Sequence, residues 1–372
     1  MRATVQDILA VSAKQAPPEL AAGWDRVGLL LGSPRQEVTR LVVALEATAA
    51  VLQGAVESGA QMVLTHHPVF LQPLQRLNPD NPLDRPIAMA IRHDLAVAAA
   101  HTNLDAAARG LNAYLAHRLE LTRVEPLTVT GTDPLLKLSV FVPVGYEDRV
   151  RQAVCRAGGG IVGNYAYCSF QCRGQGTYLP LAGAHPWQGM QGVVHRSAEV
   201  RLEILIPAGL AKTAVANLKA VHPYEEVAYD LYPLANTGNP YGFGCFGEWP
   251  EPRPFAAVVA ALKEMFRTPH IKSAGKPRPA IQRLAVCGGS GGDLIAQAWE
   301  KGAELYITGD VRYHQAVPWM LEDLTILDLG HYATEVIFIP EWGRRLQADL
   351  EAAGWTVEVM VAEWDQDPFS YL

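Results

Sequence analysis

Strand-like and helix-like segments alternate through the first third of the chain, and this alternation most constrains its fold. The strand-like segments are short apolar runs, and the segments between them place apolar residues at near-helical spacing. The expected strands are residues 41–45, 61–64 and 95–100, and the expected helices are residues 5–15, 47–58, 87–93 and 107–119. Such βαβ alternation predicts a mostly parallel sheet with helices on its faces.

The pattern changes near residue 130. Residues 128–134 and 233–242 are rich in small and turn-forming residues, and we expect both to be linkers. Between them the expected strands are residues 137–143, 165–170, 200–207 and 227–231, and the expected helices are residues 147–157 and 211–221. A strand–helix–strands–helix–strand order predicts a ferredoxin-like α+β insert.

The first pattern then resumes. The expected helices are residues 255–266 and 294–301 and a last helix that ends at Ala352, and the expected strands are residues 284–287, 305–308, 325–329 and 355–361. The prediction is an α/β core, with parallel or mixed sheets, interrupted by an α+β domain. Its parts are residues 1–130 (core), 131–238 (insert) and 239–372 (core), which agrees with the two to three domains expected for 372 residues.

Composition excludes several classes of protein. Hydrophobic residues make up 49% of the chain and charged residues 19%, which suits a large folded core. The formal net charge of −7 argues against unspecific binding to nucleic acid or anionic membranes. No signal-peptide core and no run of about 18 apolar residues is present. The five cysteines are widely spread and are expected to be reduced, so we expect a cytoplasmic protein.

Two adjacent histidines, His66 and His67, close an expected buried strand, and Pro68 follows at once. Neighbouring side chains on a regular strand point to opposite faces, so both imidazoles can aim at one place only where the strand has ended. Pro68 favours such an ending because proline cannot continue a central ladder. The pair therefore indicates a metal site at a strand tip.

Polar residues of metal-ligand type follow two further strands. His101 with Asp105 follows the strand at 95–100, and His331 with Glu335 follows the strand at 325–329. The i and i+4 spacing of His331 and Glu335 places both on one face of a helix. Ligands in open α/β sheets lie at the carboxyl ends of the strands. Each residue taken alone has a structural explanation, but the set predicts a shared site.

Imidazole and carboxylate ligands without a thiolate suit divalent transition metals, with Zn²⁺ first and Fe²⁺, Mn²⁺, Co²⁺ or Ni²⁺ as alternatives. Five ligands exceed what one catalytic zinc uses, and carboxylates can bridge. Two ions roughly 3.5–4 Å apart would fit such a set, the arrangement that activates water for hydrolysis. His101, Asp310 and His314 are expected to orient the ligand imidazoles, and Asp25 is either such a residue or a local cap.

Two other motifs allow two interpretations each. The glycine loop at residues 288–293 lies between a strand and a helix, where backbone N–H groups can cradle a phosphate, but a tight turn is the preferred interpretation. The segment from His222 to Glu226 could provide a second ligand site or form a turn before the last strand of the insert.

Several motifs together resemble the NIF-three-like family, whose members are also called dinuclear metal centre hexameric proteins or GTP cyclohydrolase one type two homologues. The matching strings are Gly23-Trp24-Asp25, Thr65-His66-His67-Pro68, His101-Thr102-Asn103-Leu104-Asp105, Thr308-Gly309-Asp310 and Gly330-His331-Tyr332-Ala333-Thr334-Glu335. The insert is similar to the PII/CutA-like domain of the longer bacterial members, with Gly163-Asn164-Tyr165, Cys168-Ser169-Phe170 and His222-Pro223-Tyr224-Glu225-Glu226 as the matching strings. The resemblance covers essentially the whole chain.

The resemblance implies that the metal ligands are His66, His67, Asp105, His331 and Glu335, with Asp105 and Glu335 as bridges. It also implies a toroidal homohexamer whose inserts form trimers at the two ends. Two positions depart from the family pattern, because Arg26 stands in place of the usual Asn and Glu46 in place of the usual Asp. Arg26 either binds an anionic substrate or points to solvent, the latter being preferred.

The leading functional hypothesis is a metal-dependent hydrolase of a small polar or nucleotide-like substrate. The alternative is a non-catalytic regulatory or metal-handling hexamer, in which the insert senses a ligand and the ions are structural. An open metal position would favour catalysis, and closure by protein ligands alone would favour the structural role.

Overall fold

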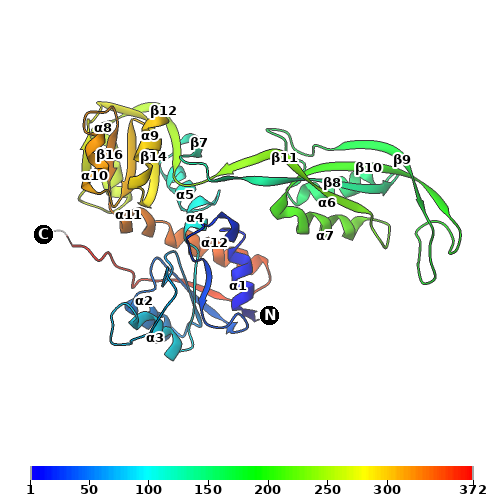
Figure 1. Cartoon of the computed structure of the whole chain (residues 1–372), viewed down its shortest axis with the longest axis horizontal. Coiled ribbons are helices and arrows are strands. Elements are labelled where there is room, and N and C mark those ends of the chain that lie inside the picture. The colour runs from blue at the N-terminus through cyan, green and yellow to red at the C-terminus, as the bar shows by residue number, and fades with distance from the viewer. Residues whose placement is uncertain (1, 371–372) are drawn as a thin grey trace. The chain divides into compact units, whose positions relative to one another are not determined.

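The computed structural model describes residues 2–370, and its contacts divide the chain into two compact units. One unit combines residues 1–130 with residues 241–372 and is called the core unit here. The other comprises residues 131–240 and is called the insert unit. Figure 1 shows the helices and strands of both units, which are described separately below.

The first sheet of the core unit has five strands in the order β17-β4-β5-β6-β2. Its strands are β2 (Gly28–Leu31), β4 (Arg40–Ala44), β5 (Met62–Thr65), β6 (Ala96–Ala99) and β17 (Glu358–Val361). The pairs among β17, β4, β5 and β6 are parallel, and β2 runs antiparallel to β6. The apolar runs of β4, β5 and β6 are almost completely buried, as expected for strands covered on both faces.

Helices cover both faces of this sheet. The helices are α1 (Val5–Ser12), α2 (Ala49–Glu57), α3 (Arg85–Arg92) and α12 (Ile339–Ala352). Alternate strand residues such as Leu41 and Met62 pack in one cluster with Ile8 of α1 and Trp342 of α12. Their neighbours, among them Val42 and Val63, pack with α2 and α3 on the other face. Thr4 begins α1 with a capping box, and β1 (Ala3–Thr4) pairs with β3 (Glu37–Val38) beside it.

The second sheet of the core unit has six strands in the order β13-β16-β15-β14-β12-β7. Its strands are β7 (Thr122–Pro126), β12 (Cys245–Pro254), β13 (Lys272–Gly275), β14 (Ala280–Ser290), β15 (Leu305–Gly309) and β16 (Thr325–Asp328). β14, β15 and β16 are parallel, and the other pairs are antiparallel. Both sheets contribute to one continuous apolar cluster. The chain is therefore a mixed α/β protein, which confirms the predicted class at this level.

Helices that accompany the second sheet are mostly short. They are α4 (Thr102–Ala106), α5 (Leu111–Arg118), α8 (Phe255–Met265), α9 (Ile295–Glu300), α10 (Tyr313–Ala316) and α11 (His331–Val336), with the 3-10 turns Pro18–Leu20, Gly292–Leu294 and Val317–Trp319 elsewhere in the core unit. No helix within residues 2–370 is long and apolar enough to cross a membrane.

The insert unit is one four-stranded sheet with two helices. Its elements are β8 (Gly131–Pro143), α6 (Glu147–Arg156), β9 (Phe170–Tyr178), β10 (His195–Pro207), the 3-10 turn Ala208–Leu210, α7 (Ala211–Val221) and β11 (Tyr229–Tyr241). The strand order is β11-β8-β10-β9, and β10 runs antiparallel to both of its neighbours. Val150 of α6 and Leu218 of α7 pack on Val140 and Leu202, so both helices cover the same face of the sheet (Figure 1).

The two segments expected to be linkers belong instead to paired strands. β8 begins at Gly131 and β11 continues to Tyr241, and the two are neighbours in the insert sheet. Just before β8, the backbone N–H of Thr130 donates to the carbonyl of Tyr241 over 2.9 Å. The prediction of two linkers was wrong because Gly, Thr and Pro indicate flexibility locally, whereas long-range backbone pairing decides the structure here.

Two further expectations require correction. The helix expected at 107–119 is shorter, because α5 begins only at Leu111, after a turn at Gly110 where a Cβ atom would lie 1.6 Å from the carbonyl oxygen of Leu104. The short helix α4, which ends at Ala106, was not expected. The strand expected to begin at residue 165 begins at Phe170, and Tyr167 before it has a positive φ of 60°. Local backbone turns therefore override the apolar pattern at both places.

Candidate metal centre

β5 ends at Thr65, and the two histidines that follow leave the strand pattern. The N–H of His66 donates to the carbonyl of Ala44 (3.0 Å), and the N–H of His67 donates to the carbonyl of Leu45 (2.9 Å). Successive N–H groups of a regular strand point to opposite neighbours, so two consecutive bonds to the same neighbouring segment mark the end of regular pairing. The two imidazole ring centroids consequently lie 4.8 Å apart.

The segment after β6 brings His101 and Asp105 to the same place. His101 precedes α4, and Asp105 lies within it. The His101 ring centroid is 5.3 Å from those of both His66 and His67. Asp25 fixes the start of this helix, because its carboxylate accepts hydrogen bonds from the backbone N–H of Thr102 (3.0 Å) and from the Thr102 hydroxyl.

The third segment follows β16 and supplies His331 and Glu335 from one face of α11. Gly330 precedes this helix with φ +90°, a conformation that favours glycine. Its N–H donates to Asp328 Oδ1 over 3.0 Å, which fixes the entry into the helix. Glu335 is buried, whereas the His331 side chain is 33% exposed and therefore borders solvent.

Glu335 lies between His66, His67 and His331, and its two carboxylate oxygens face different histidines. Oε1 lies 3.6 Å from His66 Nε2, and Oε2 lies 3.1 Å from His67 Nε2 and 3.0 Å from His331 Nε2. Asp105 Oδ1 lies 3.6 Å from His66 Nε2. Contacts of 3.6 Å are too long for hydrogen bonds, so these groups face one another across a small space.

All four histidines of the cluster bind an acceptor through Nδ1. The Nδ1 atom of His66 lies 3.0 Å from the carbonyl oxygen of Ala100. The Nδ1 atom of His331 lies 2.8 Å from the carboxylate of Asp310, and that of His101 lies 2.9 Å from the carboxylate of Asp25. In His67 the partner is Glu46, at 2.7 Å. A neutral histidine that donates through Nδ1 keeps its lone pair on Nε2. The cluster therefore presents Nε2 lone pairs, the arrangement found in metal-binding histidines.

Three polar atoms at the centre of the cluster are unpaired, which indicates whether these residues fit a metal. His66 Nε2, Asp105 Oδ1 and Glu335 Oε2 are buried, and within the described part of the chain none has a hydrogen-bond partner. Leaving buried polar atoms unpaired costs free energy, so native proteins normally satisfy them. The ligand atoms of His66, His67 and His101 lie within 4.8 Å of one another, as do those of His67, His331 and Glu335. These residues fit one or more divalent cations.

The charged groups of the cluster lie in a buried space, and their pKa values are shifted accordingly. Burial raises the pKa of Glu335, but the neighbouring imidazoles of His331, His66 and His67 outweigh this and hold the pKa well below its ordinary value. Burial lowers the pKa of His67 and of His331, yet Glu335 raises them to about 10 and about 9, respectively. Burial raises the pKa of Asp105, which His66 opposes only in part. Bound cations would take the place of these protons.

The glycine run supports the cluster rather than a phosphate. β14 continues to Ser290, and the N–H groups of Gly288, Gly289 and Gly291 donate to Asn112, Thr334 and Thr308 side chains, respectively. A Cβ atom on Gly289 would lie 2.1 Å from Glu335 Oε1 and 3.2 Å from His331 Nε2. Those N–H groups are already bonded, and the segment is the end of β14 followed by the 3-10 turn Gly292–Leu294, so the preferred interpretation as a tight turn holds only for its second half.

The residues expected to orient the imidazoles have different positions. Asp25 and Asp310 each bond a histidine Nδ1 as described above, whereas His314 is exposed on α10 with its ring 5.1 Å from Tyr313. No hydrogen bond within the described residues joins His314 to the cluster. His101 lies among the ligand atoms themselves, so the geometry favours it as a ligand, whereas we expected it only to orient others.

Sequence analysis overlooked one residue of the site, Glu46. It stands two residues beyond β4 and receives the hydrogen bond from His67 Nδ1. The same rule that found the other residues, a polar side chain just after a buried strand, would have identified it. Arg26 is exposed, and His222 bonds through both ring nitrogens, to the carbonyl of Phe141 and from the N–H of Tyr224. The His222 segment is therefore a turn.

The fold and the site define a mixed α/β protein with a candidate histidine–carboxylate metal centre. The chain belongs to the Duf34/NIF3 (NGG1p interacting factor 3) family, whose model matches residues 3–368. It is 37% identical over 367 residues to the Halalkalibacterium halodurans protein named GTP cyclohydrolase 1 type 2 homolog, covering 99% of this chain and 98% of that protein. The Bacillus subtilis protein of the same name is 36% identical over 367 residues, with the same coverage of each chain.

Solved structures agree with this assignment. A Bacillus cereus protein described as related to NIF3 superposes with a TM-score of 0.88 at 34% sequence identity, covering 100% of this chain and 99% of that one. A Staphylococcus aureus protein superposes with a TM-score of 0.71 at 26% identity, covering 100% and 99% of the two chains. The resemblance inferred from the sequence motifs is thereby confirmed.

Proposed function

We propose that this protein binds two divalent transition-metal ions at the histidine–carboxylate cluster. His66, Asp105 and one oxygen of Glu335 would hold one ion, and His67, His331 and the other oxygen would hold the second, with His101 as a further ligand. The unpaired buried atoms and the common Nδ1 bonding of the histidines support this proposal. The donor set lacks a thiolate, which suits Zn²⁺ first and Fe²⁺, Mn²⁺, Co²⁺ or Ni²⁺ as alternatives.

The activity that this site supports best is hydrolysis of a small polar substrate. Divalent cations bound there would supply Lewis-acid polarisation and lower the pKa of a water. Asp310 and Glu46 hold the imidazoles of His331 and His67 in fixed orientations, and His331, which is partly exposed, lies where the cluster borders solvent. Access from solvent favours chemistry over a closed structural site.

One exposed aromatic residue supports a planar substrate. The Trp24 side chain is exposed, and its ring centroid lies 6.0 Å from that of His101. An indole beside a metal centre offers a face on which a planar ring can stack. Relatives carry the name GTP cyclohydrolase 1 type 2 homolog, which agrees with a nucleotide-like substrate here.

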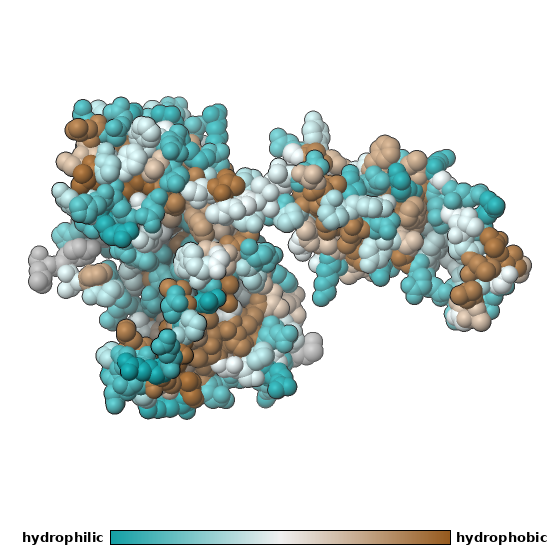
Figure 2. Space-filling model, in the orientation of Figure 1, coloured by the Kyte–Doolittle hydropathy of each residue, from teal (hydrophilic) through white to brown (hydrophobic). Residues whose placement is uncertain are grey.

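The second candidate function is a regulatory or metal-handling assembly in which the insert unit senses a ligand. A cavity of about 740 Å³ lies within the insert unit and favours this alternative. The strand–helix–strand–strand–helix–strand order of the insert unit supports its likeness to PII and CutA domains. The connection 179–194 exposes six large apolar side chains, and Figure 2 shows apolar surface at one tip of this unit. These side chains support the proposed homohexamer with trimeric inserts.

Elemental analysis after purification without chelator tests the metal proposal. We expect about two ions per chain, most of them lost in His331→Ala and retained in His314→Ala, which removes an exposed histidine outside the cluster. If neither purification nor reconstitution yields bound transition metal, the proposal is wrong. If the wild type binds metal, a screen of nucleotide-like substrates tests the hydrolase, and Trp24→Ala should then weaken substrate binding without metal loss.

A further inference from the structure

The insert unit contains a cavity on the face of its sheet opposite to α6 and α7. The side chains of Val140 and Leu202 face the helices, so Phe141 and Arg201, which are paired across the two strands, belong to the other face. The cavity of about 740 Å³ is lined by that face and by the connection that follows β9. Its volume is within the range of small-molecule sites.

Two glycines provide space in the floor of this cavity. Gly174 and Gly176 are alternate residues of the edge strand β9, opposite Glu199 and Ser197, respectively. A Cβ atom on Gly176 would lie 2.2 Å from Glu199 Oε2, whereas a Cβ on Gly174 would meet nothing within 4 Å. Glycine within a strand often marks close approach of a ligand or another backbone. Here Gly176 makes room for Glu199, and Gly174 leaves open space beside it.

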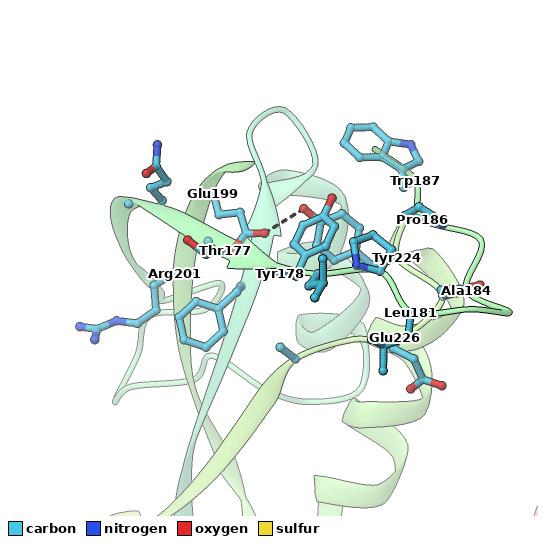
Figure 3. Close-up of a pocket in the computed structure, with 18 of the residues that line it drawn as sticks. Thr177, Tyr178, Leu181, Ala184, Pro186, Trp187, Glu199, Arg201, Tyr224 and Glu226 are labelled. Atoms are coloured by element: carbon cyan, nitrogen blue, oxygen red, sulfur yellow. Dashed lines mark hydrogen bonds between the residues drawn. The ribbon is translucent and has the colours of Figure 1, made fainter. Parts of the chain in front are cut away.

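Aromatic rings form one wall of the cavity. The ring centroids of Tyr178 and Tyr224 are 6.1 Å apart, and those of Trp187 and Tyr224 are 6.0 Å apart. Leu181 and Pro186 extend this wall from the connection that follows β9 (Figure 3). Faces of tyrosine and tryptophan carry negative electrostatic potential, so they attract cations as well as apolar groups.

Glu199 places a carboxylate in this apolar site, and the residue is only 7% exposed. Its Oε1 accepts a hydrogen bond from the Tyr224 hydroxyl over 2.8 Å, and that hydroxyl also lies 3.0 Å from Ser197 Oγ. No described residue donates a hydrogen bond to Glu199 Oε2 or forms an ion pair with Glu199. Glu199 Oε2 therefore remains able to accept a hydrogen bond from a cationic donor that enters the cavity.

The charges around the cavity do not neutralise this carboxylate. Arg201 pairs with Glu203 through a contact of 3.2 Å, and Figure 3 shows it pointing away from the tyrosines. Arg173 also belongs to the lining, but it is opposite Val200 in the register and no ion pair within the described residues joins it to Glu199. Glu226 adds a second carboxylate to the lining. The cavity therefore complements positive charge.

We propose that this cavity binds a small organic cation with N–H donors, an alkylammonium or a guanidinium attached to an apolar body. Glu199 Oε2 accepts the N–H bond, the aromatic wall receives the apolar body, and Gly174 leaves the space for it. Such a cation would be the ligand that the insert unit senses in the second candidate function, and its binding does not depend on the metal centre.

Calorimetric titration of the full chain with phenethylammonium, and with uncharged 2-phenylethanol as its neutral analogue, tests the proposal. We expect saturable binding of the ammonium and at least tenfold weaker binding of the alcohol. Glu199→Gln keeps the shape and the Tyr224 contact and should weaken ammonium binding about tenfold or more. Asp148→Asn, which removes an exposed carboxylate on α6 at the opposite face of the sheet, should bind like the wild type.

A second pair of variants tests the place of binding. Gly174→Leu should fill the cavity and abolish binding, and Gly209→Leu, where an added Cβ also meets nothing within 4 Å, should leave binding unchanged. Equal affinity for the two probes, unchanged binding in Glu199→Gln and Gly174→Leu, or no binding of the ammonium by folded wild type would each overturn the proposal. Absent binding combined with dissociation of an oligomer by Gly174→Leu, seen by sedimentation, would identify the cavity as an interface between copies instead.

Discussion

Gly289 lies directly against Glu335, because a Cβ atom at this glycine would come within 2.1 Å of the carboxylate oxygen Oε1. Glu335 is the residue whose two oxygens face different histidines, so its position controls both halves of the proposed centre. Gly289 also has φ +65°, which an L side chain rarely adopts. The backbone of β14 at Gly289 thus determines where Glu335, a proposed ligand on α11, can lie.

Gly289→Ala is expected to disrupt metal binding and to destabilise the protein. The positive φ costs about 1–2 kcal/mol, and crowding against Glu335 adds about 1–3 kcal/mol. Gly354→Ala is the matched control, because Gly354 has φ +82° but nothing within 4 Å of an added Cβ. Denaturant unfolding and metal analysis of both variants distinguish the two effects. Metal retained in full by Gly289→Ala would contradict the role given to Glu335.

Glu46→Ala is expected to weaken metal binding by about 10–100-fold without lowering the number of ions at saturation. Glu46 accepts the hydrogen bond from His67 Nδ1, so its loss frees the imidazole to rotate or change tautomer. Glu46→Asp keeps the charge and should restore part of the affinity. Titration with a competing chelator measures this, and equal affinities for wild type and Glu46→Ala would rule out the orienting role.

His101→Ala is expected to reduce the bound metal, because the geometry places this imidazole among the ligand atoms. His314→Ala is the control, since His314 is exposed and contacts Tyr313. Elemental analysis at equal metal concentration compares the two. If His101→Ala binds the full complement with only reduced affinity, His101 orients ligands instead of binding metal.

The metal-free protein is expected to lose stability between pH 7 and pH 10. Glu335 raises the pKa of His67 to about 10 and that of His331 to about 9, although burial lowers both. Raised pKa values in the folded state stabilise it fully below the ordinary value near 6.5, and this stability is lost as the pH rises through 9 to 10. Melting temperatures with chelator, for wild type and His331→Gln, test this. A pH dependence that is identical in both proteins would contradict the assignment.

Metal binding should show the opposite trend. Cations displace the protons that the histidines carry, so apparent metal affinity is expected to rise with pH up to about 10 and binding should release protons. Calorimetry in buffers of different ionisation enthalpy counts these protons. Proton uptake on binding would contradict the sign.

Sequence patterns predicted the strand ends better than the connections between them. Runs such as Met62–Thr65 are fully buried, so their apolar residues are unambiguous, and the polar residues after them stand out. The rule that strand ends meet at one edge brings together His66 and Asp105, which follow neighbouring strands of the first sheet. His331 follows β16 of the second sheet, so the expectation of a single shared edge was wrong for it. Burial and chain direction are both readable locally, which is why this part of the site could be predicted.

Features that depend on distant pairing could not be predicted. β11 pairs with β8, which is far from it in the sequence, and small residues in both strands indicated linkers. Likewise, Gly289 lies near the end of β14, and nothing near it in the sequence indicates the carboxylate that lies against it. Glu46 is different, because its position two residues after β4 is a local signal, whereas its contact with His67 is long-range.

The hydrogen bond from Thr130 N–H to the Tyr241 carbonyl closes the core unit at the place where the insert departs and returns. The two ends of the core chain are thus already held side by side, as the ends of a hairpin are. A turn of a few residues can join them with little loss of chain entropy. The core unit and the insert unit can accordingly be gained, lost or exchanged as separate modules, without redesign of their sheets.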